Sequence, residues 1–164
     1  VWKTHNRRVE TFRSPELGFL GVADPDTVLF YRASLKPHTV AATFPIEAVD
    51  DLPSVDIVSD YTGLEARVLG DAVGRDPDGI VVATFAGGRM SAGAREGVLE
   101  AIEDDVPVAL ASRVPGGRIV GDVTGGSGAL VVRDLSPYKA RILLMLALTI
   151  TTDPTELQRI LDKY

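Results

Sequence analysis

Short apolar runs alternate with amphipathic stretches through the middle of this 164-residue chain. The runs at 55–58, 80–84 and 106–110 are rich in β-branched residues and have the length of buried strands. Between them, 64–73 and 91–105 repeat apolar residues at helical spacing. Strands and helices that alternate in this way predict an α/β fold. We expect three layers, α/β/α, with a small, mainly parallel sheet covered on both faces.

Helix start signals recur along the second half of the chain. Ser91, Ser136 and Asp153 each stand where an N-cap residue is preferred, and Pro137 and Pro154 follow two of them in the first helical turn. Apolar residues crowd the helix that Ser136 begins, so we expect it to be buried on most of its circumference. Its apolar positions are Ile142, Leu143, Leu144, Leu146, Leu148 and Ile150.

Ligands of open α/β sheets bind outside the carboxyl ends of the strands. In this chain the loops at that edge are expected at 59–63, 85–91 and 111–117. The segment 114–128 contains six glycines and is expected to be irregular.

Composition excludes several classes of partner and site. A formal net charge of -6 argues against nucleic acid, because no basic stripe is present to bind its phosphates. No apolar run is long enough to cross a bilayer, so we expect a soluble chain without a membrane partner, either cytoplasmic or exported. The chain has no cysteine, and His5 and His38 are isolated, so no metal site is expected. No phosphate-binding glycine motif occurs, and no cofactor is expected.

Five motifs occur along the chain in a fixed order. VWKTHN with TFRSPELGFLG comes first, then LPSVDIV with Tyr61, then GIVVA before a glycine-rich turn, then SRVPGG, and finally LSPYKARILLMLALTITTD with a following LQ. In wording and order these motifs closely resemble the bacterial-type L-asparaginases, the family of asparaginase and glutaminase amidohydrolases. The resemblance covers essentially the whole chain.

This resemblance implies that the chain is the C-terminal domain of such a protein with part of its interdomain linker. Residues 1–26 would be linker, and 27–164 a Rossmann-like or flavodoxin-like domain. A first residue that is Val rather than Met agrees with a missing N-terminal domain. In the family a Thr nucleophile, activated by a Lys and an Asp, hydrolyses the side-chain amide of asparagine, or of glutamine. All of these groups would lie outside this chain, so we expect no catalytic residue in it and no activity of the chain alone.

The resemblance also identifies candidate residues at the strand ends. The family has an Asn in the glycine-rich turn after the strand that corresponds to GIVVA, and this Asn reaches the active site of a neighbouring subunit. Gly87 and Gly88 lie in that turn here, and Arg89 takes the place of the Asn. Arg89 could bind a substrate carboxylate through its planar fork, or it could be an ordinary solvated arginine. The family also has an acidic residue in the loop after SRV. Asp122 is the sole carboxylate within 114–128. It could be a weak substitute for the family's acidic residue, or it could simply form a turn.

Ser112 and Arg113 begin the SRV motif, and we expect them to build a structural loop at a subunit interface. The family completes its active sites with the C-terminal domain of a partner, so the resemblance implies a homodimer or homotetramer that binds a small amino acid. Two alternatives stay open. The chain could belong to a non-catalytic binding or assembly module of this fold, or to an amidase subunit that supplies ammonia to a transferase.

Overall fold

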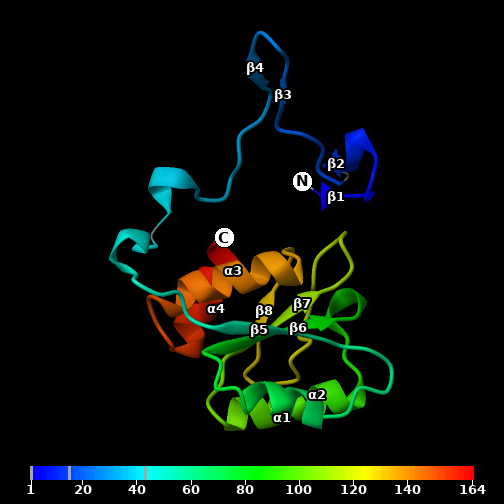
Figure 1. Ribbon diagram of the computed structural model, residues 1–164, viewed down its shortest axis with the longest axis vertical. Helices are drawn as coiled ribbons and strands as arrows, with labels where there is room; N and C mark the ends of the chain where they lie inside the picture. Colours follow the sequence, from blue (N-terminus) through cyan, green and yellow to red (C-terminus); the bar gives the residue numbers. More distant parts are fainter. Residues whose placement is uncertain (1, 15, 43) are drawn as a thin grey trace. The chain divides into compact units, whose positions relative to one another are not determined.

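The computed structural model describes residues 2–14, 16–42 and 44–164. Val1 and Pro15, which belong to the first of the five motifs, lie outside the described residues. Contacts within the chain divide it into two compact units, Val1–Ala41 and Ala42–Tyr164 (Figure 1).

The first unit holds two short antiparallel strand pairs. β1 (Trp2–Lys3) pairs with β2 (Phe12–Arg13), and β3 (Gly21–Ala23) pairs with β4 (Val28–Phe30). Two 3-10 turns, η1 (Val9–Thr11) and η2 (Thr39–Ala41), complete it. The expected boundary between linker and domain, at residues 26 and 27, falls in the turn between β3 and β4, and it stays a prediction.

The second unit is built on a four-stranded parallel sheet. Its strands lie side by side in the order in which they occur along the chain. The strands are β5 (Val55–Ser59), β6 (Gly79–Thr84), β7 (Val108–Ser112) and β8 (Leu130–Val132). The helices are α1 (Arg67–Val73), α2 (Ala92–Glu103), α3 (Pro137–Leu148) and α4 (Pro154–Lys163), and the 3-10 turns are η3 (Ile46–Ala48) and η4 (Ala86–Gly88).

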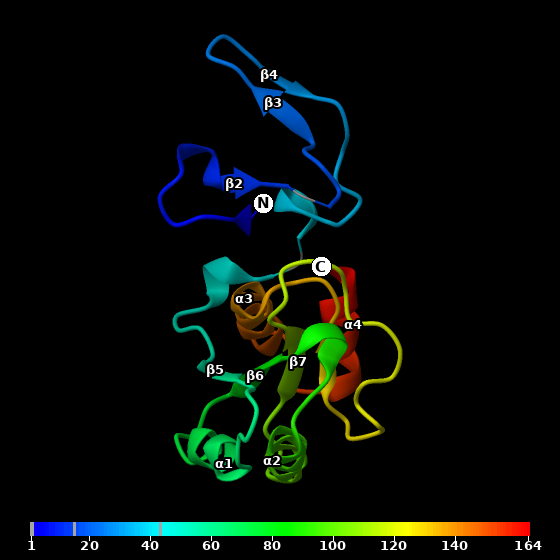
Figure 2. The same ribbon diagram turned by 90° about the vertical axis from the view of Figure 1, so that its right-hand side faces the viewer.

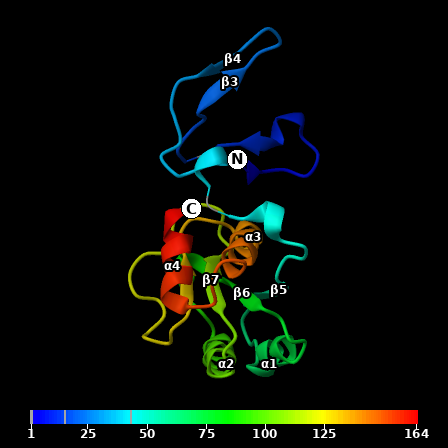
Figure 3. The same cartoon turned by 90° about the vertical axis from the view of Figure 1, so that its left-hand side faces the viewer.

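Helices cover both faces of this sheet. α1 and α2 lie against one face, and α3 and α4 lie against the other (Figures 2 and 3). Alternate residues of β6 therefore enter different cores: Val81 packs with the α3 and α4 residues, whereas Ile80 and Val82 pack with those of α1 and α2. All six residues of β6 are buried. The predicted three-layer α/β/α fold is confirmed.

The predicted helix starts are also confirmed. The side chains of Ser91, Ser136 and Asp153 accept hydrogen bonds from backbone N–H groups three residues ahead, at 3.2, 3.5 and 2.9 Å. Pro137 and Pro154 stand in the first turns of α3 and α4.

Several element boundaries differ from the prediction. α1 begins at Arg67, not at residue 64, because Leu64 closes a turn by donating its N–H to the Tyr61 carbonyl. α2 ends at Glu103, two residues before the left-handed backbone of Asp105. Val106 then donates back to the Ala101 carbonyl, so the next strand begins only at Val108.

The expectation that α3 is buried on most of its circumference is confirmed, with exceptions at single apolar positions: Tyr138, Lys139 and Ile142 are its exposed residues. Its sheet-facing residues Leu143, Leu144 and Ala147 are buried, but Ile142 is 50% exposed and Ile150, beyond the end of α3, is 47% exposed. Apolar composition alone did not distinguish the outward positions from the inward ones.

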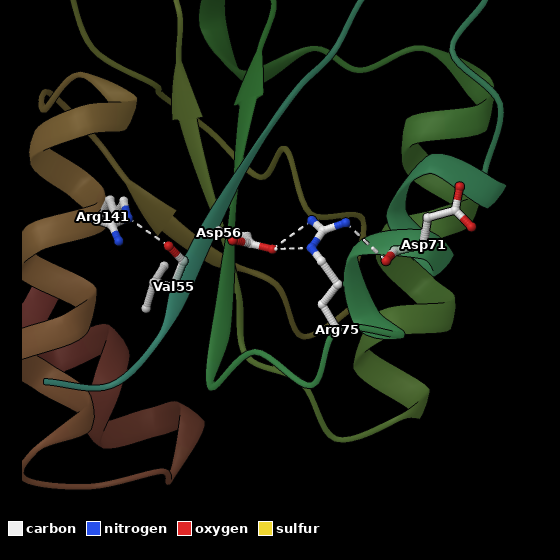
Figure 4. A network of polar contacts seen from close by, with 5 residues as sticks. All are labelled: Val55, Asp56, Asp71, Arg75 and Arg141. Carbon is white, nitrogen blue, oxygen red and sulfur yellow. Dashed lines mark hydrogen bonds and ion pairs between the residues drawn. The ribbon is translucent and has the colours of Figure 1, made fainter. Parts of the chain in front are cut away.

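Side chains bind the backbone of both outer strands. On β8, Val131 donates its N–H to Gln158 Oε1 at 2.8 Å, and Gln158 Nε2 donates to the Val131 carbonyl at 3.1 Å. On β5, Arg141 reaches across from α3 and donates from Nε to the Val55 carbonyl at 2.6 Å (Figure 4). Arg75, just after α1, approaches β5 from the other side.

Arg75 links the end of α1 to β5. Its guanidinium is 2.6 Å from Asp56 Oδ2 and donates to the Asp71 carbonyl at 3.1 Å (Figure 4). The Arg75 side chain is largely exposed, so we expect this pair to add little to stability.

Candidate functional site

The carboxyl ends of the four parallel strands meet at one edge of the sheet. The loops 60–66, 85–91 and 113–129 leave the strands there, and we call these three segments the rim loops. The strand order β5-β6-β7-β8 never reverses along the sheet. In open α/β sheets the ligand crevice forms where the order reverses, and this four-stranded sheet has no such reversal.

Asp60 joins the rim loops to one another. It directly follows β5 and is 0% exposed. Its Oδ2 accepts a hydrogen bond from the Ser91 N–H at 2.8 Å, and its Oδ1 accepts one from the Ser91 hydroxyl at 2.7 Å. Arg113 Nη1 donates to the Asp60 carbonyl at 2.8 Å. Asp60 thus contacts the loops that follow β6 and β7.

Arg113 also covers the start of the loop that follows β6. Its guanidinium carbon lies 4.4 Å from the centre of the Phe85 ring, within the range of a cation–π contact. Its backbone N–H donates to the Thr84 carbonyl at 3.0 Å. The neighbouring Ser112 hydroxyl accepts from the Val114 N–H at 3.1 Å. Arg113 and Ser112 therefore make structural contacts within the rim, and their place at a subunit interface stays a prediction.

The turn with Gly87, Gly88 and Arg89 is tightly closed. The Phe85 N–H donates to the Arg89 carbonyl at 2.9 Å, and both glycines have left-handed backbones with φ of 67° and 83°. Gly87 is exposed, whereas Gly88 is buried. Arg89 is exposed at the end of the turn, and within the described residues its guanidinium contacts no partner. This cation is available to an anionic group from outside.

Asp122 forms the turn that the glycine-rich loop requires. Its Oδ1 accepts from the Thr124 hydroxyl at 2.8 Å, from the Thr124 N–H at 3.0 Å and from the Gly125 N–H at 3.1 Å. These bonds, above all the one from the Thr124 hydroxyl, hold the pKa of the Asp122 carboxyl below its usual value. The geometry favours the role of turn former over that of substrate ligand.

The described residues form no metal site and no membrane-spanning helix, and the cavity beside α4 lies apart from the candidate residues. Across residues 2–14, 16–42 and 44–164, no group of three or more His, Cys, Asp or Glu side chains could hold a metal ion. None of the described helices has both the length and the apolar character to span a membrane. A cavity of about 540 Å³ lies beside α4, where Ile150, Arg159 and Lys163 are among its lining residues, and none of the candidate residues lines it.

Residues 54–161, more than half of the chain, match the family described as Glutaminase/Asparaginase C-terminal domain. The chain belongs to this family. It is 33% identical over its whole length to L-asparaginase 2 of Bacillus subtilis and 34% identical to L-asparaginase 2 of Escherichia coli, covering 44% and 48% of those proteins. It is 30% identical to the glutaminase-asparaginase of Pseudomonas fluorescens, covering 46%. The resemblance predicted from the five motifs is confirmed.

A solved structure places this asparaginase C-terminal domain in the same fold. The probable cytoplasmic L-asparaginase from Campylobacter jejuni superposes on 99% of this chain with a TM-score of 0.90 and 36% identity, and the match covers 54% of that chain. The chain therefore spans about half the length of the curated relatives and of the solved structure that it matches. One further relative, from Haemophilus influenzae, is named a probable periplasmic L-asparaginase, so the matched proteins are named for two compartments.

Sequence reasoning missed Asp60 and its bond to Ser91. A carboxylate directly after a buried strand is a visible signal, and Ser91 stands at an N-cap position. Their pairing across 31 residues depends on how the strands are ordered in the sheet, and no local pattern contains that order.

Proposed function

We propose that this chain is the C-terminal domain of an L-asparaginase-like amidohydrolase, which hydrolyses L-asparagine to L-aspartate and ammonia. The observation that carries the proposal is the match of the whole chain to proteins named L-asparaginase, at 33–34% identity. Relatives named glutaminase-asparaginase match at lower identity, which favours asparagine over glutamine as the first substrate to test.

In this proposal the chain supplies binding groups and not the reacting groups. Acyl transfer needs a nucleophile, a base and oxyanion donors around one centre. The rim loops offer a cation at Arg89 and a glycine turn, and the strand order of the sheet has no reversal. The remaining groups would come from an N-terminal domain, and the site would be completed between subunits of a homodimer or homotetramer.

Exposed apolar side chains in the first unit support such partners. Phe12, Phe19, Phe30 and Tyr31 are 67%, 60%, 75% and 63% exposed. Large apolar residues in this number on a small unit are typical of surfaces that another part of a protein covers. A hairpin with two three-residue strands is also only marginally stable on its own.

Arg89 is the proposed ligand of the substrate's α-carboxylate. Its guanidinium presents parallel N–H groups that match a carboxylate, and such charge-assisted pairs are stronger than neutral hydrogen bonds. Gly87 lies beside it with an exposed backbone, so the turn can approach a small amino acid closely. We call residues 87–89 the substrate clamp, and we assign Asp122 to the shape of the loop.

Ammonia release tests this proposal. The 164-residue chain with L-asparagine is expected to release no more ammonia than a heat-inactivated control. The complete protein with its N-terminal half is expected to hydrolyse L-asparagine and release ammonia. In the complete protein, Arg89→Ala should raise KM for asparagine about tenfold or more, as expected for a lost charge-assisted hydrogen bond. Arg159→Ala, which removes an exposed arginine on α4, is the matched control. Turnover by the chain alone, or a complete protein without amidohydrolase activity, would contradict the proposal.

One observation favours a second candidate, a non-catalytic binding or assembly module. Arg89 stands where the family has an Asn, and segment 114–128 contains no Glu. A complete protein that binds asparagine or aspartate in calorimetry without releasing ammonia would support this module. Ammonia release from glutamine only in the presence of a transferase would instead indicate an amidase subunit.

A further inference from the structure

Asp60 is a fully buried carboxylate that the proposed chemistry does not use. It is 0% exposed, and a buried charge is costly unless it is paired or hydrogen-bonded. Both of its carboxylate oxygens accept hydrogen bonds, and both bonds come from the same residue, Ser91. The Asp60 carboxylate therefore acts on the rim loops at one residue, Ser91.

This residue lies at the beginning of α2. Ser91 is the N-cap of this twelve-residue helix, and its hydroxyl accepts from the Ala94 N–H at 3.2 Å while donating to Asp60. A negative charge is stabilised at a helix N-terminus by the unpaired N–H groups and the helix dipole. Asp60 therefore fixes the first turn of α2 from a neighbouring strand, and Ser91 stands only two residues after Arg89.

The backbone carbonyl of Asp60 acts on the start of the turn 85–89. Its carbonyl accepts from Arg113 Nη1, and the Arg113 guanidinium covers the Phe85 ring. Phe85 in turn donates its N–H to the Arg89 carbonyl. The turn 85–89 is thus held at its start through Arg113 and just beyond its end through Ser91.

We propose that Asp60 is a positioning residue for the substrate clamp: its carboxylate, through Ser91, and its carbonyl, through Arg113, set where residues 87–89 lie. The inference rests on the proposed function, because the clamp is assigned there. Placement matters for such a role, since a shift of about 1 Å in a positioned group can cost catalysis about a hundredfold.

The first test measures the position of the turn in the chain alone, without ligand. Asp60→Ala, Asp60→Asn and the control Arg141→Met are compared by backbone amide shifts and hydrogen exchange in NMR. Arg141→Met removes a hydrogen bond from the opposite end of β5. In Asp60→Ala we expect shifted amides at Gly87 and Gly88, and exchange at Ser91 faster by about tenfold or more. The control should leave these amides unchanged.

Asp60→Asn separates positioning from general destabilisation. Its amide oxygen can still accept from the Ser91 N–H, so the Gly87 and Gly88 amides should return close to their parent positions. If Asp60→Ala does not fold, Ser91→Ala takes its place and should shift the same amides in the same direction by less. A folded Asp60→Ala chain whose clamp amides coincide with those of the parent would overturn the inference, as would a control that moves them equally.

A second measurement keeps this inference apart from the proposed function. In the complete protein, Asp60→Ala should raise KM for asparagine severalfold, and Asp60→Asn should restore most of the loss. If the complete protein releases no ammonia but the clamp amides move as described, only the proposed function fails. If it is active and KM is the same in Asp60→Ala as in the parent, the positioning role fails and the function stands.

Discussion

Gly88 occupies a position that disfavours any side chain. Its φ of +83° is strained for any residue with a Cβ, and a Cβ there would lie 3.0 Å from Ile119 Cγ2 and 3.1 Å from Val123 Cγ2. Ile119 is completely buried, so it cannot move aside without cost. The absence of a side chain at Gly88 therefore lets Ile119 and Val123 of the glycine-rich loop pack closely against the clamp.

Gly87 provides the matched comparison for a substitution at Gly88. Its φ is +67°, but a Cβ there would meet nothing within 4 Å. We expect Gly87→Ala to cost about 1 kcal/mol for the left-handed backbone. Gly88→Ala should cost about 1 kcal/mol more than that, because of the added steric conflict. Urea unfolding of both variants measures the difference, and equal losses would show that Ile119 and Val123 yield freely.

Asp122 makes the order of its loop depend on pH. Its carboxyl pKa is lower in the folded chain than in the unfolded one, so ionised Asp122 supports the turn at neutral pH. This support is complete above the ordinary carboxyl value and is lost as pH falls through the lower, folded pKa. An NMR titration should move the Thr124 and Gly125 amides only in acid, below about pH 4. Asp122→Asn should remove this step, and a midpoint at or above the ordinary value would contradict the assignment.

At the scale of elements, α2 approaches α1 closely because of a second glycine. A Cβ on Gly97 would lie 2.9 Å from the Ala66 carbonyl oxygen and 2.9 Å from Leu69 Cβ. Leu69 is completely buried between the helices and the sheet. Backbone and core atoms such as these cannot rotate away, so the distance between the two helices depends on Gly97.

We therefore expect opposite effects from two glycine-to-alanine changes on facing helices. Gly70→Ala on α1 should stabilise the fold by about 1 kcal/mol, because a Cβ there meets nothing within 4 Å and alanine favours a helix. Gly97→Ala should destabilise it by about 1–3 kcal/mol despite the same gain, since α1 must move. Thermal unfolding followed by circular dichroism compares them. A stabilised Gly97→Ala variant would contradict the close approach.

The sequence predicted elements where the signal is local. Ser136 with Pro137, and Asp153 with Pro154, mark the starts of α3 and α4 by side chains that bond within their own turns. Boundaries failed where the decision is not local: Leu64 fits a helical pattern, yet its N–H closes a turn to Tyr61. β8 carried no expectation of its own, because three residues after a glycine-rich loop are too few to show a period.

At the scale of the whole molecule, the two units differ in what holds them together. Both hydrophobic cores consist of residues from Phe44 onward, and within the described chain neither includes a residue of the first unit. The strands of that first unit are only two or three residues long. Stability should therefore reside almost entirely in Ala42–Tyr164.

A chain shortened to residues 42–164 tests this division. We expect it to unfold cooperatively, with a free energy of unfolding within about 1 kcal/mol of the full chain, because no core contact is lost. Light scattering should find the shortened chain monomeric, and the full chain more prone to associate through its exposed Phe12, Phe19 and Phe30. Loss of cooperative unfolding in the shortened chain would show that the first unit contributes to the core.

The candidate site was only partly predictable because its contacts depend on the order of the strands in the sheet. Parallel strands implied that the loops after them would share one edge, and Arg113 does contact Phe85 of the loop 85–91 there. The link between them, Asp60, depends on β5 lying directly beside β6, which the local pattern does not specify. Arg89 and Asp122 were both candidates by residue type, with Asp122 the weaker of the two, and the hydrogen bonds of Asp122 identify it as a loop former.

Gln158 has a consequence for how this protein behaves at high concentration. Its carboxamide presents one donor and one acceptor to Val131, as the peptide group of a fifth strand would. A foreign polypeptide that docks along β8 would first have to displace this built-in surrogate. The N–H and the carbonyl of Val131 are thus already hydrogen-bonded at the outer edge of the sheet. One side chain from α4 therefore opposes the addition of a further strand, and with it fibril-like growth, at β8.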